Sequence, residues 1–252
     1  FIMTNKFMYF IANWKMFGDI KSLNSLNKVL KFSRHKKNNK FRLIYCPPYT
    51  LLNLFHKKIK NSNIELGAQN CHEEEVSGPF TGSISSKMLK KIGAKYVIVG
   101  HSENRAIGES NLTINKKIKS SINSGLKIIF CIGETLQQRK KKQTHKVLLD
   151  QISKGLKGIK KMNNVIFAYE PVWSIGTGIT PKANDLKKNI AFLRNSLLKK
   201  FRLKNPKILY GGSVNPKNVR NFKEINIIDG FLVGGASQDS KKFIDIVKKT
   251  FN

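Results

Sequence analysis

Residues 165–178 read Val165-Ile166-Phe167-Ala168-Tyr169-Glu170-Pro171-Val172-Trp173-Ser174-Ile175-Gly176-Thr177-Gly178, an apolar run that ends on a carboxylate and is broken at once by a proline. The apolar run predicts a buried strand, and Pro171 ends it because proline fixes φ and has no N–H donor. The strand brings Glu170 to the mouth of a pocket, and the two glycines give the following loop the freedom of a closing lid. We therefore predict that Glu170 is a catalytic base and that the loop after it is a lid over the pocket. The alternative is a glutamate that simply ends a strand beside an ordinary loop.

Eight apolar runs separated by amphipathic stretches indicate a closed barrel. Runs buried on both faces are typical of parallel strands, and here they lie at Met8–Ala12, Phe41–Cys46, Ile64–Ala68, Tyr96–Val99, Lys127–Cys131, Val165–Tyr169, Lys207–Tyr210 and Gly230–Val233. Segments with apolar residues at three- and four-residue spacing predict helices between them, for example Ile20–Phe32, Ser85–Ile92, Ile114–Ile122, Thr144–Lys157, Asp185–Leu198, Pro216–Phe222 and Lys241–Phe251. An open doubly wound sheet would carry G-x-G-x-x-G after the first strand, and that motif is absent. We predict an α/β fold, a (β/α)₈ barrel in which residues 1–252 form a single domain.

Length and cysteine content agree with this prediction. A chain of 252 residues is typical of one such barrel. No apolar run is long enough to span a bilayer, and Phe1–Lys6 lacks the order of a signal peptide, so we expect a cytoplasmic protein. Cys46, Cys71 and Cys131 are odd in number and lack C-x-x-C spacing, which predicts buried, reduced thiols and no metal site.

The charge is unusual, because Lys and Arg number 47 against 15 Asp and Glu, for a net charge of +32. Such a charge attracts nucleic acid or an anionic membrane in any fold. The lysines, however, are spread over nearly every polar segment, without an aromatic platform or a nucleic-acid motif among them. We interpret the charge as compositional drift, with binding to nucleic acid or membrane at most nonspecific, and keep a polyanion-binding protein as the alternative.

Other strand ends also carry polar groups, which is where barrels place their chemistry. The first predicted strand ends in Ala12-Asn13-Trp14-Lys15, and the fourth is followed by Gly100-His101-Ser102-Glu103. Gly-Gly turns follow the seventh and eighth strands, as Gly211-Gly212-Ser213 and Gly234-Gly235. Backbone amides at such turns approach an anion closely, so they predict a phosphate site.

With one departure at Ser174, the stretch Ala168–Gly178 resembles the signature of the triosephosphate isomerase family, and the resemblance extends from Phe10 to Ala236. It implies an intramolecular oxidoreductase of glycolysis and gluconeogenesis, without cofactor, that interconverts dihydroxyacetone phosphate and D-glyceraldehyde 3-phosphate through an enediolate. It also implies a homodimer in which Thr81 of a protruding loop enters the partner's site. The implied catalytic residues are Glu170, His101, Lys15, Asn13 and Glu103; the implied phosphate ligands are Asn13, Lys15, Gly176, Ser213, Gly234 and Gly235; the implied lid is Pro171, Val172, Trp173, Ser174, Ile175, Gly176 and Thr177.

Several positions depart from the family pattern, namely Phe17, Ser83, Asn104 and Pro181. Cys131-Ile132-Gly133-Glu134-Thr135 also matches the family, and we expect a structural role there. A barrel isomerase acting on a phosphoribosyl substrate would share the Gly-Gly turns, but it would need a different acid–base pair. A polyanion-binding protein on an inactive barrel would have no need of an intact Glu170.

Overall fold

The computed structural model describes residues 6–34, 40–222 and 225–251. Residues 1–5, on which the expectation about a signal peptide rests, lie outside the described part. Within the described ranges, no helix is both long and apolar enough to cross a membrane.

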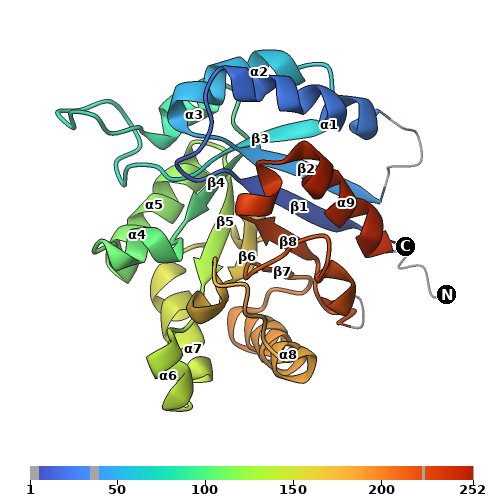
Figure 1. Cartoon of the computed structure of the whole chain (residues 1–252). Coiled ribbons are helices and arrows are strands. Elements are labelled where there is room, and N and C mark those ends of the chain that lie inside the picture. Colours follow the sequence, from blue (N-terminus) through green and yellow to red (C-terminus); the bar gives the residue numbers. More distant parts are fainter. Residues whose placement is uncertain (1–5, 35–39, 223–224, 252) are drawn as a thin grey trace.

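The core of the fold is a closed barrel of eight parallel strands in chain order (Figure 1). The strands are β1 (Met8–Asn13), β2 (Phe41–Cys46), β3 (Ile64–Ala68), β4 (Tyr96–Val99), β5 (Lys127–Ile132), β6 (Val165–Tyr169), β7 (Lys207–Tyr210) and β8 (Gly230–Val233). β1 closes the barrel by pairing with β8, where Tyr9 lies opposite Gly230. The predicted barrel is therefore confirmed, and only β1 and β5 extend one residue beyond their predicted ends.

Side chains alternate between two apolar layers along each strand, since successive residues of a strand point to opposite faces. The inner layer fills the barrel and contains Ile11, Ile98, Ile166, Ala168 and Leu209, among others. The outer layer includes the intervening residues and packs under the helices. A residue two positions beyond the last inner residue of a strand therefore points toward the mouth of the barrel.

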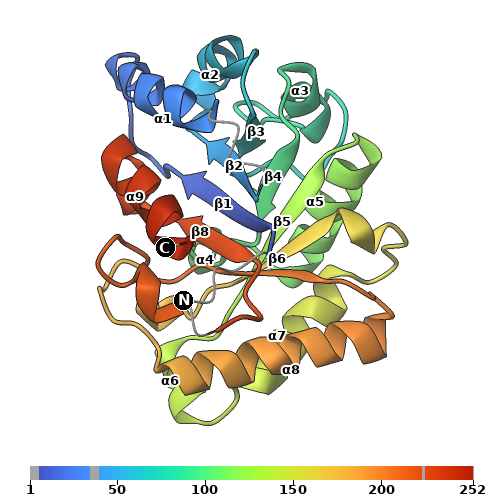
Figure 2. The same cartoon turned by 90° about the vertical axis from the view of Figure 1, so that its right-hand side faces the viewer.

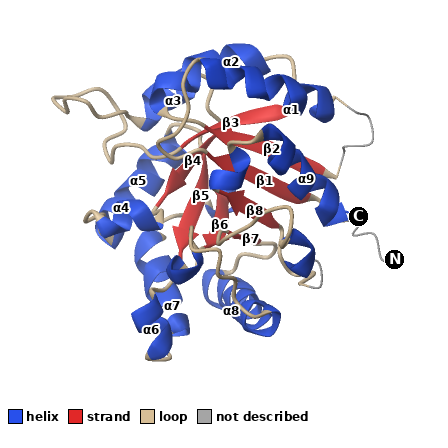
Figure 3. Cartoon of the chain, in the orientation of Figure 1, coloured by secondary structure: helices blue, strands red, loops and turns tan. Residues whose placement is uncertain are grey.

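Helices surround the strands on all sides (Figure 3). The α-helices are α1 (Leu26–Ser33), α2 (Leu52–Ile59), α3 (Ser86–Lys91), α4 (Ser102–Ala106), α5 (Asn111–Asn123), α6 (Leu136–Lys140), α7 (Thr144–Gly155), α8 (Ala183–Phe201) and α9 (Ser240–Phe251). The 3₁₀ turns are η1 (Lys21–Ser25), η2 (Tyr49–Leu51), η3 (Met162–Asn164), η4 (Val172–Ser174), η5 (Val219–Phe222) and η6 (Gly235–Ser237). Figure 2 shows α1 and α2 on one side of the barrel and α7 and α8 on the opposite side.

Two predicted helices differ from the structure. The segment Ile20–Phe32 is divided into the turn η1 and the helix α1. The prediction for Pro216–Phe222 is wrong as an α-helix, because only the 3₁₀ turn Val219–Phe222 forms there. Asn215 accounts for part of this difference: its side chain accepts bonds from the N–H groups of Lys217 and Asn218, which offers the backbone an alternative to helical pairing.

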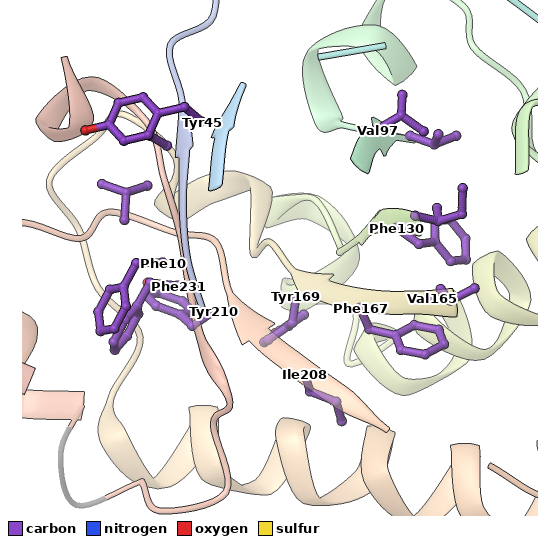
Figure 4. Packing of buried hydrophobic residues seen from close by; sticks show 14 of the residues in the cluster. Phe10, Tyr45, Val97, Phe130, Val165, Phe167, Tyr169, Ile208, Tyr210 and Phe231 are labelled. Carbon is purple, nitrogen blue, oxygen red and sulfur yellow. The ribbon is translucent and has the colours of Figure 1, made fainter. Parts of the chain in front are cut away.

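Aromatic rings fill much of the layer between the strands and the helices (Figure 4). Phe10 of β1 and Phe231 of β8 have ring centroids 5.9 Å apart, and Phe130 of β5 and Phe167 of β6 have theirs 6.2 Å apart. Contacts between rings from adjacent strands stabilise the barrel, and with it the strand ends that carry the polar residues.

Candidate active site

A cavity of about 230 Å³ lies at the carboxyl ends of the strands and gathers most of the predicted site residues. Its lining residues are Asn13, Lys15, His101, Glu170, Ile175, Gly176, Gly178, Gly211, Gly212, Ser213, Val214, Asn215, Leu232, Gly234, Gly235 and Ala236. Segments from β1, β4, β6, β7 and β8 therefore meet in one place, as expected where the strands of a barrel end.

Glu170 points into this cavity because of its place in β6. Ile166 and Ala168 belong to the inner apolar layer, and Glu170 is the next residue in that alternation. Its N–H donates to the carbonyl of Ile132 at 2.8 Å, which continues the pairing of β6 with β5. Gly133 allows this close approach, since a Cβ there would lie 1.8 Å from the carbonyl oxygen of Glu170. The carboxylate is thereby held on a rigid backbone.

The Glu170 carboxyl group is 3% exposed, and burial raises its pKa above the ordinary value. His101, the Cys131 thiol and Lys15 act in the opposite direction, and Glu103 adds a small rise. Among the described residues, no side chain or backbone group makes a hydrogen bond to Glu170 Oε2. The nearby Cys131 thiol, a weak donor, contributes only by lowering the pKa of the carboxyl group. A buried carboxylate with an unpaired oxygen and a raised pKa is a stronger base than an ordinary glutamate, which suits it to accept a proton.

His101 is buried beside Glu170, with Nε2 3.4 Å from Oε1 of that carboxylate. Its Nδ1 accepts the backbone N–H of Glu103 at 3.2 Å, at the N-terminus of α4. A nitrogen that accepts a hydrogen bond carries no proton, so the ring is neutral and bears its proton on Nε2. The Glu103 carboxylate lies 3.5 Å from Nδ1, but this nitrogen already receives the backbone proton. The ring can therefore donate from Nε2 into the cavity.

Lys15 has a left-handed backbone, with φ of 54°. Contacts on either side hold this uncommon conformation: Asn13 Oδ1 accepts the Lys15 N–H at 3.1 Å, and Gln69 Nε2 donates to the Lys15 carbonyl at 2.8 Å. The ammonium group bonds Glu103 Oε1 at 2.6 Å. The predicted link between Glu103 and the lysine is thus present in the structure. Gln69 was not predicted in this role, since its spacing carries no signal for a contact with Lys15.

The glycine turns after β7 and β8 line the same cavity from the other side. Ser213 lies between the turn and the lid: its hydroxyl donates to the Ser174 carbonyl at 2.7 Å and accepts the Gly178 N–H at 3.2 Å. Gly235 begins the turn η6, and Gly234 directly precedes it. Backbone amides at such a turn favour an anion. Lys15 supplies positive charge beside them, since a Cβ at Gly234 would lie 3.4 Å from the Lys15 side chain.

The predicted lid begins as the turn η4 and continues over the cavity, where Ile175 and Gly176 form part of the wall. Trp173 holds its start, since Nε1 donates to Glu134 Oε1 at 3.0 Å and the guanidinium of Arg139 lies 4.1 Å from the ring centroid. Glu134 also accepts the Tyr169 hydroxyl. Glu134, which lies in the segment expected to have a structural role, therefore contacts the lid directly.

Thr81 is not in this cavity. It is exposed on the long loop between β3 and α3, which projects from the molecule in Figure 1. Cys46, Cys71 and Cys131 are buried and free, as predicted. Within the described ranges there is no cluster of three or more His, Cys, Asp or Glu side chains that could hold a metal ion.

Comparison with known proteins agrees with this geometry. A sequence model of the family described as triosephosphate isomerase matches residues 8–250. The triosephosphate isomerase of Aquifex aeolicus (strain VF5) is 43% identical over 242 residues, 94% of this chain and 96% of that protein. That of Thermodesulfovibrio yellowstonii is 40% identical over 250 residues, 98% and 100% of the two chains. A crystal structure of triosephosphate isomerase from Bartonella henselae superposes with a TM-score of 0.87 at 35% identity, covering 96% of this chain and 98% of that one. The chain therefore belongs to the triosephosphate isomerase family and interconverts triose phosphates.

Proposed function

We propose that Glu170 is the general base that removes a proton from the carbon beside the substrate carbonyl. The observation that carries this assignment is that Glu170, His101 and Lys15 line one small cavity, with the glutamate carboxylate 3.4 Å from the histidine Nε2. Both triose phosphates have an acidic C–H next to a carbonyl, so a base on one side and hydrogen-bond donors on the other suit the reaction.

His101 and Lys15 stabilise the enediolate oxygens that develop as the proton leaves. His101 donates as a neutral imidazole, which is a well-known feature of this family. A cation about 4 Å from an oxyanion, at an effective dielectric near 20, contributes roughly 4 kcal/mol. Asn13 and Glu103 orient Lys15 through the contacts described above. His101 then moves protons between the oxygens, and Glu170 returns its proton to the adjacent carbon.

The phosphate of the substrate binds to backbone amides on the far side of the cavity. Gly234 and Gly235 face it from the turn after β8, Ser213 from the turn after β7, and Gly176 from the lid. Asn13 and Lys15 complete the polar lining. Residues 171–177 act as the lid, which excludes water and keeps the enediolate from losing its phosphate.

We further propose a cytoplasmic homodimer in which residues 1–252 form one domain. Met16 and Phe17, directly after Lys15, are 95% and 58% exposed, and Phe80 is exposed on the projecting loop. Exposed apolar side chains mark an interaction surface where they gather in one patch, and we assign these three to the dimer interface. Thr81 would reach toward Asn13 and Lys15 of the partner. The net charge of +32 supports at most a nonspecific, salt-sensitive affinity for nucleic acid or anionic membranes.

Substitution of Glu170→Gln tests the assignment of the base, because the amide keeps the shape but cannot accept the proton. We expect kcat to fall about 10²–10⁴-fold in a coupled assay with glyceraldehyde 3-phosphate. Glu65→Gln is the control: Glu65 lies in β3 and accepts the Tyr96 hydroxyl, away from the cavity lining, so kcat is expected to stay unchanged. Retention of more than about a tenth of kcat by Glu170→Gln would contradict the mechanism.

A further inference from the structure

Ser174 is the one residue between Ala168 and Gly178 that departs from the family signature, and its side chain is fully buried within the lid. It does not line the cavity, so it does not touch a substrate bound there. A hydroxyl buried in a loop stays there only if its polar atoms are paired. Its partners therefore indicate what the residue does.

The Ser174 hydroxyl joins three segments. Its Oγ donates to the Ile179 carbonyl at 2.6 Å, and it lies 3.0 Å from the Tyr210 hydroxyl. Since a carbonyl can only accept, the Ser174 proton points to Ile179, and Tyr210 donates to Ser174 Oγ. We call Ser174, Ile179 and Tyr210 the clasp.

The clasp closes the lid upon itself. The bond from Ser174 to Ile179 spans residues 175–178, which include Ile175, Gly176 and Gly178 of the cavity wall. Thr177 reinforces this loop, because its Oγ1 donates to the Trp173 carbonyl at 3.1 Å. The tip of the lid is therefore held as one unit, which reduces the conformational freedom that it would lose on closing.

The clasp also connects the lid to the end of β7, where Tyr210 is the last residue. Tyr210 is fully buried, and Ser174 is the only hydrogen-bond partner of its hydroxyl among the residues that the structure describes. The Ser174 carbonyl accepts from both the N–H and the Oγ of Ser213, at 3.1 and 2.7 Å. Removal of the Ser174 hydroxyl would leave the buried Tyr210 hydroxyl unpaired while the lid is docked, which favours undocking.

We propose that Ser174 is a positioning residue that keeps the lid docked through its hydroxyl, so that the Gly176 amide faces the substrate phosphate. The inference rests on the proposed function, in which Gly176 binds phosphate and the lid retains the enediolate. Ser174 acts through Gly176 and Tyr210 and takes no part in the proton transfers.

A loosened lid has a chemical signature apart from slower turnover. When the lid opens before reprotonation, the electron pair of the enediolate expels the phosphate: the C–O bond to phosphate breaks, inorganic phosphate leaves, and the remaining enol tautomerises to a three-carbon ketoaldehyde. The ratio of phosphate released to triose phosphate isomerised therefore reports how well the lid holds the intermediate. A loss of global stability alone does not change this ratio, since it changes only the amount of folded enzyme.

The test compares Ser174→Ala with Ser86→Ala. Ser86 in α3 is also fully buried; its hydroxyl donates to the Ser120 carbonyl at 3.1 Å and lies 2.8 Å from Ser124 Oγ, away from the cavity. We expect Ser174→Ala to lower kcat/KM about three- to thirtyfold and to raise the elimination ratio by a similar factor. Ser86→Ala is expected to change neither quantity, although both variants lose a buried hydroxyl.

Tyr210→Phe is the second variant, because it removes only the bond to Ser174 and keeps the ring. It is expected to raise the elimination ratio as well, and the double variant is expected to show less than the product of the two single effects. An unchanged elimination ratio in both single variants would overturn the proposal that Ser174 keeps the lid docked. Absence of isomerase activity in the wild-type enzyme, or an undiminished kcat of the Glu170→Gln variant, would instead contradict the proposed function.

Discussion

Substitution of Gly211→Ala perturbs the catalytic base from a neighbouring strand without altering the base itself. A Cβ at residue 211 would lie 2.7 Å from Cγ of Glu170 and 3.1 Å from its Oε1. Ordinary carbon contacts begin near 3.4 Å, so Cγ of Glu170 has to move by about 0.7 Å, the difference between 3.4 and 2.7 Å, and the carboxylate moves with it. The backbone of Glu170 cannot follow, because Gly133 and Ile132 of the adjacent β5 segment hold it.

A displacement approaching 1 Å in a catalytic group lowers the rate by up to about 10²-fold. We therefore expect Gly211→Ala to lower kcat by roughly 30- to 100-fold in the coupled assay with glyceraldehyde 3-phosphate, with a smaller effect on KM. Gly155→Ala is the matched control: its Cβ would lie 2.5 Å from the Phe130 ring under α7, so it is expected to lower Tm and leave kcat unchanged.

The two variants separate loss of packing from loss of geometry. If folded Gly211→Ala kept kcat within about threefold of the wild type, the position of the Glu170 carboxylate would not limit the reaction, and its assignment as the base would be refuted. Equal effects of both variants on kcat would indicate a general loss of structure.

Three further predictions concern stability and assembly. Burial raises the pKa of Glu170 in the folded protein, so ionisation of this carboxyl group destabilises the fold as pH rises from the ordinary glutamate pKa through the raised value. Glu170→Gln removes this ionisation and is therefore expected to raise Tm at neutral pH, with the gain vanishing below about pH 4. Thermal unfolding measured against pH tests this expectation. Asp229 is 2% exposed, bonds Arg194 Nη2 at 2.7 Å and Lys6 Nζ at 2.9 Å, and accepts the buried Ile208 N–H at 2.9 Å. Asp229→Ala removes all three contacts, so it is expected to lower the free energy of unfolding by about 3–5 kcal/mol in urea titrations. The family resemblance implies that residues 83 and 104 face each other across the proposed dimer interface, where other members carry a glutamate and an arginine that form an ion pair. Ser83→Glu alone is therefore expected to weaken association, because its carboxylate has no partner, and Asn104→Arg in addition is expected to restore a coupling of roughly 0.5–3 kcal/mol in dimer dissociation measurements. Strictly additive effects would show that the two residues do not face each other.

Much of this protein is determined locally. The eight strands follow from apolar runs of four to six residues, because a strand buried on both faces needs a continuous apolar segment. Six of the eight strands begin and end where predicted. The alternation along β6 also places Glu170 at the mouth of the barrel once Ile166 and Ala168 point inward. The sequence motif then distinguishes the family from other barrels with glycine turns.

The tertiary structure decides the properties that depend on groups distant in the chain. The left-handed conformation of Lys15 is stabilised by Gln69, 54 residues away, and its charge is paired with Glu103, 88 residues away. The raised pKa of Glu170 arises from burial by segments of several strands, and no local pattern encodes that environment. The sequence also gives no sign of the contact between Ser174 and Tyr210, because a serine in a loop is an ordinary polar residue. The two hydroxyl groups meet only because the barrel brings the ends of β6 and β7 side by side.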